Sequence, residues 1–186
     1  MNQKKMRSIA VALIVGAAAG CSSTPISAPA SAPSGGGAVA FAFSPGAGDQ
    51  TAEALVLEMI SSAKHSIHLA AYSFTSKPIA EALRDASRRG VTVMVVLDKS
   101  NKTAKYSGAT FLKNAGIPVR IDSKYAIMHD KFMVIDGATV ETGSFNYTSA
   151  AAEKNAENAI VIRGSAGVAE GYDAEWKRLW DESEEF

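Results

Sequence analysis

Hydrophobic and polar positions alternate along residues 38–186 in a way that predicts two kinds of element. Short apolar runs are typical of buried strands, and the segments between them repeat their apolar residues every three or four positions, as amphipathic helices do. Such an alternation predicts an α/β domain. The predicted strands are 38–43, 66–73, 91–97, 117–121, 128–135, 139–142 and 158–163. The predicted helices are 51–63, 77–89, 109–115 and 165–181.

The last predicted helix carries a stripe of large apolar side chains at steps of four, namely Val168, Tyr172, Trp176 and Trp180. A stripe with this spacing is typical of a helix face that packs against a core. We therefore expect these four side chains to be structural.

The first 37 residues differ in composition from the rest. Lys4, Lys5 and Arg7 precede an uncharged apolar run over 8–20, which is shorter than a membrane-spanning helix needs. This pattern predicts a signal peptide over 1–20 and an exported, periplasmic protein. Residues 21–37 are rich in Ser, Pro, Ala and Gly, a composition that predicts a tether before a folded domain at 38–186.

Cys21 is the only cysteine of the chain, and with the preceding run AAG it resembles a bacterial lipoprotein cleavage site. This resemblance implies lipidation of Cys21 and, because Ser22 follows it, a tether to the outer membrane. Ala18 stands where the pattern prefers leucine, so ordinary signal cleavage after Ala19 or further along stays open. A single cysteine excludes a disulfide framework within the chain and a zinc site made of several cysteines.

The overall composition suits a globular core, with 47% hydrophobic and 20% charged residues. The 19 basic and 19 acidic residues cancel, but they are unevenly distributed. Residues 60–131 contain 12 Lys and Arg against 5 Asp and Glu, while residues 132–186 contain 4 against 11. A basic segment can attract a polyanion, although solvated helix faces are the ordinary explanation.

The polar positions with chemical potential gather in residues 128–147, which read MHDKFMVIDGATVETGSFNY. On a strand starting at Met128, His129 and Lys131 project from the same face. A hairpin turn at Asp136-Gly137 returns the chain, and Gly143 lets the backbone bend sharply before Ser144 and Asn146. The pattern predicts one imidazole beside one cation and two neutral hydrogen-bonding side chains. Such donors suit a phosphoryl group better than a carbonyl group.

The same string fits H-x-K-x4-D-x6-G-S-x-N, with His129, Lys131, Asp136, Gly143, Ser144 and Asn146 at its fixed positions. This is the signature of the phospholipase D superfamily, and the chain is most similar to its small, single-motif bacterial periplasmic endonucleases. The resemblance extends over AYSFTS at 71–76 and KNAENAIVI at 154–162. It implies an α/β fold, with a mixed, mostly parallel β-sheet flanked by helices in an α/β/α sandwich.

The resemblance also implies a role for each site residue. His129 would attack phosphorus and form a phosphohistidine, while Lys131, Ser144 and Asn146 hold the non-bridging oxygens. Glu157 would accept a hydrogen bond from the far ring nitrogen of His129. Asp136 belongs to the motif but is expected to be structural. No cofactor and no metal ion are expected, because fixed lysines supply the positive charge.

In-line displacement requires an acid on the side of phosphorus opposite the nucleophile. One histidine cannot occupy both sides, and the motif occurs once in this chain. Family members with a single motif form two-fold homodimers that share one active site. The resemblance therefore implies that this chain has a second copy of itself as its partner.

These observations predict a metal-independent phosphodiesterase. The preferred interpretation is a nonspecific endonuclease acting on DNA and RNA. A phospholipase D that hydrolyses phospholipid head groups at a membrane is the alternative, and a noncatalytic nucleic-acid-binding protein of the same fold is a third. A groove for a phosphate backbone is one interpretation of Lys99, Lys102, Lys105, Arg120, Lys124 and Tyr125, and a solvated loop is the other. His65 and His68 are expected to be structural.

Overall fold

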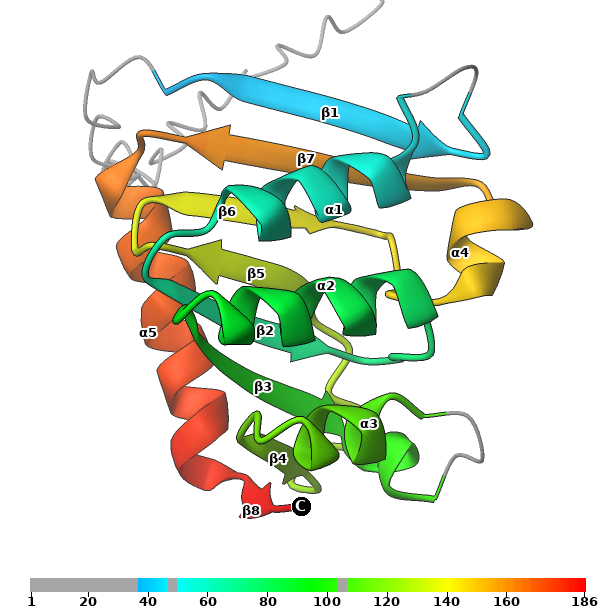
Figure 1. Ribbon diagram of the computed structural model, residues 1–186, viewed down its shortest axis with the longest axis vertical. Coiled ribbons are helices and arrows are strands. Elements are labelled where there is room, and N and C mark those ends of the chain that lie inside the picture. Colours follow the sequence, from blue (N-terminus) through cyan, green and yellow to red (C-terminus); the bar gives the residue numbers. More distant parts are fainter. Residues whose placement is uncertain (1–36, 47–49, 104–106) are drawn as a thin grey trace, which may run out of the picture. The chain divides into compact units, whose positions relative to one another are not determined.

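The computed structural model describes residues 37–46, 50–103 and 107–186. They form one eight-stranded sheet in the order β1-β7-β6-β5-β2-β3-β4-β8 (Figure 1). The expected signal peptide at 1–20, Cys21 and nearly all of the 21–37 tether lie outside the described residues. The strands are β1 (Val39–Ser44), β2 (Ser66–Ala71), β3 (Thr92–Asp98), β4 (Val119–Asp122), β5 (Lys131–Ile135), β6 (Thr139–Gly143), β7 (Glu157–Arg163) and β8 (Glu184–Glu185).

The sheet is mixed, as expected, but most of its neighbouring strands are antiparallel. Parallel pairing joins β2 to β3 and β3 to β4. The other five neighbouring pairs are antiparallel. The expectation of a mostly parallel sheet was therefore wrong. Helical crossovers make parallel neighbours of β2, β3 and β4, whereas a tight turn between β5 and β6 makes the chain double back.

Helices cover both faces of the sheet, which confirms the α/β/α arrangement (Figure 1). One face carries α1 (Ala52–Ser62), α2 (Lys77–Arg88) and α3 (Ala109–Asn114), and the other carries α5 (Ala166–Glu182). The core under the first three helices is built from buried side chains such as Met59, Ile60, Ile67, Leu69, Leu83, Val93 and Leu112. The core under α5 contains Ala70, Val96, Phe132, Val134, Val140, Trp176 and Leu179.

Short polar side chains start the first two helices. Thr51 Oγ1 accepts a hydrogen bond from the Ala54 backbone N–H at 3.1 Å and begins α1. Ser76 Oγ accepts the corresponding bond from Ile79 at 3.3 Å and begins α2. These caps fix where each helix starts relative to the strand before it.

The aromatic stripe of α5 packs as expected at its C-terminal half. Trp176 is buried, stacks on His68 with ring centroids 4.1 Å apart, and donates from Nε1 to the Leu69 carbonyl at 3.0 Å. Trp180 stacks on Trp176 at 5.0 Å. His68 also lies 2.6 Å from an Asp173 carboxylate oxygen through Nδ1, so it joins β2 to α5 and is structural, as predicted.

Three short elements were not predicted from the pattern. They are the 3₁₀ turn η1 (Lys99–Lys102), the helix α4 (Ser149–Glu153) and the two-residue strand β8. Elements this short do not complete enough periods to stand out from loops. β8 pairs with β4 at the C-terminal end of the described chain and covers that edge of the sheet.

Candidate active site

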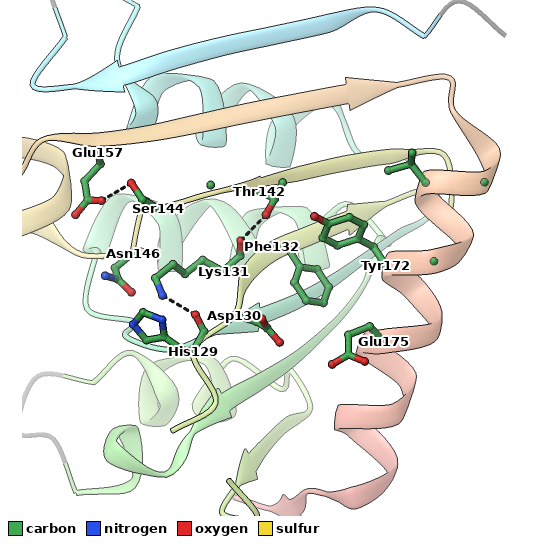
Figure 2. A pocket seen from close by; sticks show the side chains of 14 residues that line it. His129, Asp130, Lys131, Phe132, Thr142, Ser144, Asn146, Glu157, Tyr172 and Glu175 are labelled. Atoms are coloured by element: carbon green, nitrogen blue, oxygen red, sulfur yellow. Dashed lines mark hydrogen bonds between the residues drawn. The ribbon is translucent and has the colours of Figure 1, made fainter. Parts of the chain in front are cut away.

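A cavity of about 950 Å³ opens where the loop before β5, the loop after β6 and the start of β7 meet α5 (Figure 2). Its lining includes five of the six residues predicted for the site: His129, Lys131, Ser144, Asn146 and Glu157. The structure therefore brings together residues that lie up to 28 positions apart in the chain. Asp136, the sixth, does not line the cavity.

His129 lies in the loop just before β5, because the strand begins at Lys131 and not at Met128 as expected. The buried carboxylate of Asp98 fixes this loop by accepting the Met128 backbone N–H at 2.8 Å. The ring of Tyr72 lies against the imidazole, with centroids 4.6 Å apart. His129 itself is exposed, so one side of its ring is open to a substrate.

Lys131 is the first residue of β5 and is 7% exposed. Its Nζ donates to the His129 carbonyl oxygen at 2.6 Å and lies 5.2 Å from the centre of the Tyr72 ring. Burial lowers the pKa of Lys131, while Asp130 and Glu157 act in the opposite direction. The ammonium is therefore fixed next to His129 by a bond to its backbone carbonyl.

Ser144 and Asn146 lie on a tight turn after β6 that depends on Gly143. A Cβ on Gly143 would lie only 2.2 Å from the Asn158 carbonyl oxygen of β7, so a larger residue does not fit without movement of the backbone. The same carbonyl accepts the backbone N–H groups of Ser144 at 3.1 Å and Phe145 at 3.2 Å. Asn146 Oδ1 is buried and has no hydrogen-bond partner among the described residues.

Glu157 is held by other groups than expected. Its carboxylate accepts a hydrogen bond from Ser144 Oγ at 2.6 Å (Figure 2) and another from Asn155 Nδ2 at 3.0 Å. Within the described part of the chain, no hydrogen bond joins it to His129. Glu157 thus belongs to the site but is oriented by Ser144 in this structure.

Asp136 fastens the turn between β5 and β6 to the start of β2. Its carboxylate accepts the backbone N–H groups of Lys64 at 2.9 Å, His65 at 2.7 Å and Ser66 at 2.9 Å. Its own backbone φ is 53°, a left-handed conformation that suits aspartate in a turn. These contacts lie outside the cavity, which fits the structural role expected of Asp136.

We expect Asp136→Asn to lower the free energy of unfolding at pH 7 by about 1–2 kcal/mol, because an amide accepts these bonds less strongly than a carboxylate and the site is partly solvated. Partial burial raises the pKa of Asp136, but the bonds from Ser66, His65 and Lys64 outweigh it, and the net pKa lies below its usual value. A depressed pKa gives stability that is present above the unfolded pKa of about 4 and is lost as pH falls through the folded value.

Urea unfolding at pH 7 and pH 3 measures this effect. The gap between wild type and Asp136→Asn should shrink at pH 3. The surface variant Asp85→Asn serves as the control, since Asp85 contacts only arginine side chains of α2. An equal gap at both pH values would contradict a role for the ionised carboxylate.

The sequence did not identify the side of the cavity that α5 forms. Gly167, Val168, Gly171, Tyr172 and Glu175 line it, and two of these belong to the stripe that was expected to be purely structural. Tyr72, which contacts His129, was not singled out either, although it lies in the AYSFTS segment. A helical stripe is compatible with core and cavity alike, so spacing alone could not separate them.

Asp130 points away from His129 and Lys131, toward the α5 side of the cavity (Figure 2). Burial and the nearby Glu175 raise the pKa of Asp130, whereas Lys131 and Arg178 lower it to a smaller extent. The cavity therefore has a cationic end at Lys131 and an acidic and aromatic side along α5.

The proposed basic groove does not line the cavity in the described residues. Lys99 Nζ donates to the Tyr125 carbonyl at 2.8 Å, and Arg120 donates to the Trp180 carbonyl at 2.8 Å. Lys124 pairs with Glu182. Arg120 and Lys124 thus join β4 and the loop after it to α5, Lys99 holds the loop at Tyr125, and Lys105 lies outside the described residues.

No three His, Cys, Asp or Glu side chains of the described segments are grouped so that they could hold a metal ion. No helix in those segments is both long and apolar enough to cross a bilayer.

Comparison with known proteins places this fold and cavity in a family. The family model described as "Cardiolipin synthase, PLD-like domain" matches residues 56–180. A protein named "Phospholipase D" from Rickettsia bellii is 43% identical over 121 residues, covering 65% of this chain and 60% of that protein. Its namesake from Rickettsia conorii is 40% identical over 138 residues, covering 74% and 67%. The chain thus spans about 60–67% of the length of these relatives.

The fold of this chain agrees with a solved structure over almost the whole length of that structure. The crystal structure of a phospholipase D family member, Nuc from Salmonella typhimurium, superposes with a TM-score of 0.77 and 41% sequence identity. The superposition covers 81% of this chain and 98% of Nuc. The chain therefore belongs to the phospholipase D superfamily of phosphodiesterases.

Proposed function

We propose that this protein is a metal-independent phosphodiesterase with His129 as its nucleophile. An imidazole nitrogen bonds to phosphorus, the bond from phosphorus to the leaving oxygen breaks, and an acid on the opposite side protonates that oxygen. Water then gives a proton back to that acid and attacks the phosphohistidine, the nitrogen–phosphorus bond breaks, and free imidazole is restored. The observation that carries the proposal is the convergence of His129, Lys131, Ser144 and Asn146 in one open cavity.

The neighbouring side chains support this chemistry by their charge. The fixed ammonium of Lys131 attracts the phosphate oxygens and stabilises the negative charge that grows in the transition state. Asn146 supplies a neutral donor beside Lys131 (Figure 2), and the Ser144 hydroxyl, which donates to Glu157 in this structure, would turn to the phosphate to supply another. The ammonium provides charge that a metal ion supplies in other phosphoryl-transfer sites.

We propose further that a second copy of the chain supplies the in-line acid. The cavity residues Phe132 and Thr142 are register partners, Thr142 pairs with Ile160, and Ile160 pairs with Phe41. Directly paired residues face the same side of a sheet, so this row runs from the cavity across β6 and β7 to the edge strand β1. An apolar surface therefore continues from the cavity to the sheet edge.

This surface ends in large apolar side chains that face solvent in the single chain. Val39, Phe41 and Phe43 are 57%, 67% and 57% exposed, and the two phenylalanine rings contact edge to face at 5.8 Å. Exposed aromatic patches of this kind mark interaction sites. A second copy is the occupant that the chemistry requires, because a patch contiguous with the cavity would bring two copies of His129 to one substrate.

Nucleic acid is the proposed substrate, with nonspecific endonuclease activity on DNA and RNA. The motif resembles that of small single-motif endonucleases, and the alignment with Nuc covers nearly all of that chain. His129 and Ser144 are exposed, which leaves the reacting centre accessible to a polymer. Phospholipase D activity is the second candidate, favoured by the names of the rickettsial relatives and by Phe132, Val168 and Tyr172 in the cavity.

We propose export through the segment over 1–20 and, with Cys21 lipidated, a tether to the outer membrane. The support is the sequence pattern of basic residues, apolar run and cysteine. In that location the enzyme would meet nucleic acid that enters the periplasm.

Parallel substrate assays in excess EDTA test the proposed function. We expect the full chain to nick plasmid DNA and to degrade single-stranded RNA, while vesicles of phosphatidylcholine or cardiolipin stay intact. Release of head groups with an intact plasmid would favour phospholipase D activity instead. Retention of DNA without turnover would favour a noncatalytic binding protein.

A further inference from the structure

Glu141 is a carboxyl group buried on the side of β6 that faces away from the cavity. It is 1% exposed, and its register partner in β5 is Met133. The next residue, Thr142, lines the cavity, as expected when successive side chains of a strand alternate between faces. Burial raises the pKa of Glu141 to about 8, and a hydrogen bond from Tyr147 opposes this only in part. The carboxyl group is therefore mostly protonated at neutral pH.

Tyr147 is the hydrogen-bond partner of this carboxyl group. Its hydroxyl donates to Glu141 Oε2 at 2.8 Å, and its side chain is fully buried. Between these two residues the chain makes the turn that carries Ser144 and Asn146. The bond thus ties the two ends of a loop together, and the tip of that loop lies in the cavity.

Tyr147 also fastens this loop to the segment beside the nucleophile. Its carbonyl oxygen accepts the backbone N–H groups of Thr75 and Ser76, both at 2.9 Å. A few residues earlier in that segment, Tyr72 lies against the ring of His129. Tyr147 therefore connects both halves of the site: its side chain holds the turn that would bind phosphate, and its backbone carbonyl holds the segment that carries Tyr72.

We propose that Glu141 is a positioning residue for the reaction: through Tyr147 it holds Ser144 and Asn146 at the separation from His129 that phosphoryl transfer requires. The inference rests on the proposed phosphodiesterase function. Replacing a buried polar pair by apolar residues of similar size is often neutral for stability. We therefore expect the bond between Glu141 and Tyr147 to matter for the position of the turn more than for stability. A displacement of a catalytic group by about 1 Å can lower the rate about 100-fold.

The test measures kcat and KM of full-chain variants on bis(4-nitrophenyl) phosphate, together with urea unfolding. Glu141→Gln keeps a neutral acceptor for the Tyr147 hydroxyl, so its kcat should stay within about 3-fold of wild type. Glu141→Leu with Tyr147→Phe removes both polar groups and leaves neither unpaired. This double variant should unfold near the wild-type urea concentration, yet its kcat should fall about 10- to 100-fold with little change in KM.

Tyr147→Phe alone gives a second measurement and should lower kcat to a similar extent. A double variant that folds and retains the wild-type kcat would overturn the inference, and so would a Glu141→Gln variant as impaired as the double variant. If the wild-type chain hydrolyses no phosphodiester, the proposed function fails and the inference fails with it. An active wild type beside an unaffected double variant refutes the positioning role alone.

Discussion

Replacing His129 with alanine is expected to lower phosphodiester hydrolysis about 10⁴-fold or more, leaving only what binding and charge stabilisation provide. The methyl group cannot bond to phosphorus, and Lys131 is held as a donor to the His129 carbonyl oxygen. Ser144 donates to the Glu157 carboxylate, but its hydroxyl is a weaker nucleophile than a neutral imidazole. Initial rates on plasmid DNA and on bis(4-nitrophenyl) phosphate measure the loss.

His65→Ala is the matched control, because His65 is exposed and lies outside the cavity. It should leave both rates unchanged. Wild-type reactions with a ³²P-labelled diester, quenched with denaturant at alkaline pH, should contain labelled protein, and His129→Ala reactions should not. Substantial turnover by His129→Ala, or label retained by it, would show that another group attacks phosphorus.

Changing Phe41 and Phe43 together to serine is expected to convert a dimer into monomers and to lower kcat about 100-fold or more. The two rings make the outer end of the apolar row that leads from the cavity, and serine would leave a polar surface there. A monomer would lack the second imidazole that protonates the leaving oxygen, and acid catalysis of this kind contributes about 10²–10⁴-fold. Sedimentation velocity and initial rates on the same samples measure both effects.

Phe111→Ser is the control for this pair. Phe111 is 38% exposed and lies on α3, on the opposite face of the sheet. It should change neither the sedimentation coefficient nor the rate. A double variant that stays dimeric and active would contradict the proposed interface. A wild type that is monomeric and fully active would contradict the proposal that catalysis needs a dimer.

Most helices and strands could be predicted because each has its own apolar period, from Thr92–Asp98 in β3 to Ala166–Glu182 in α5. The order of strands could not be predicted in the same way. The pairing of β1 with β7 joins residues more than 110 positions apart, and it is decided by which apolar faces fit together. The mistaken expectation of a mostly parallel sheet arose at this level.

In the candidate site too, local sequence predicted some features, while others depend on contacts between distant parts of the chain. His129, Lys131, Ser144 and Asn146 could be placed together because a tight hairpin brings neighbouring parts of the chain into contact. The partners of Glu157 could not be foreseen, since the spacing of a motif does not say which polar groups a carboxylate meets. The hydrogen bond between Glu141 and Tyr147 could not be predicted either. The alternation of side chains along a strand shows which face of the sheet a side chain lies on, but not which side chain it contacts there.

The direction of β1 determines how the protein can be attached to a surface without loss of access. The strand starts beside Ile162 and ends beside Glu157, at the cavity. Gly37 therefore lies at the end of β7 that is remote from Glu157, beside Arg163. A bead or a sensor chip attached at Gly37 would meet the domain at that end, away from Glu157 and Ser144.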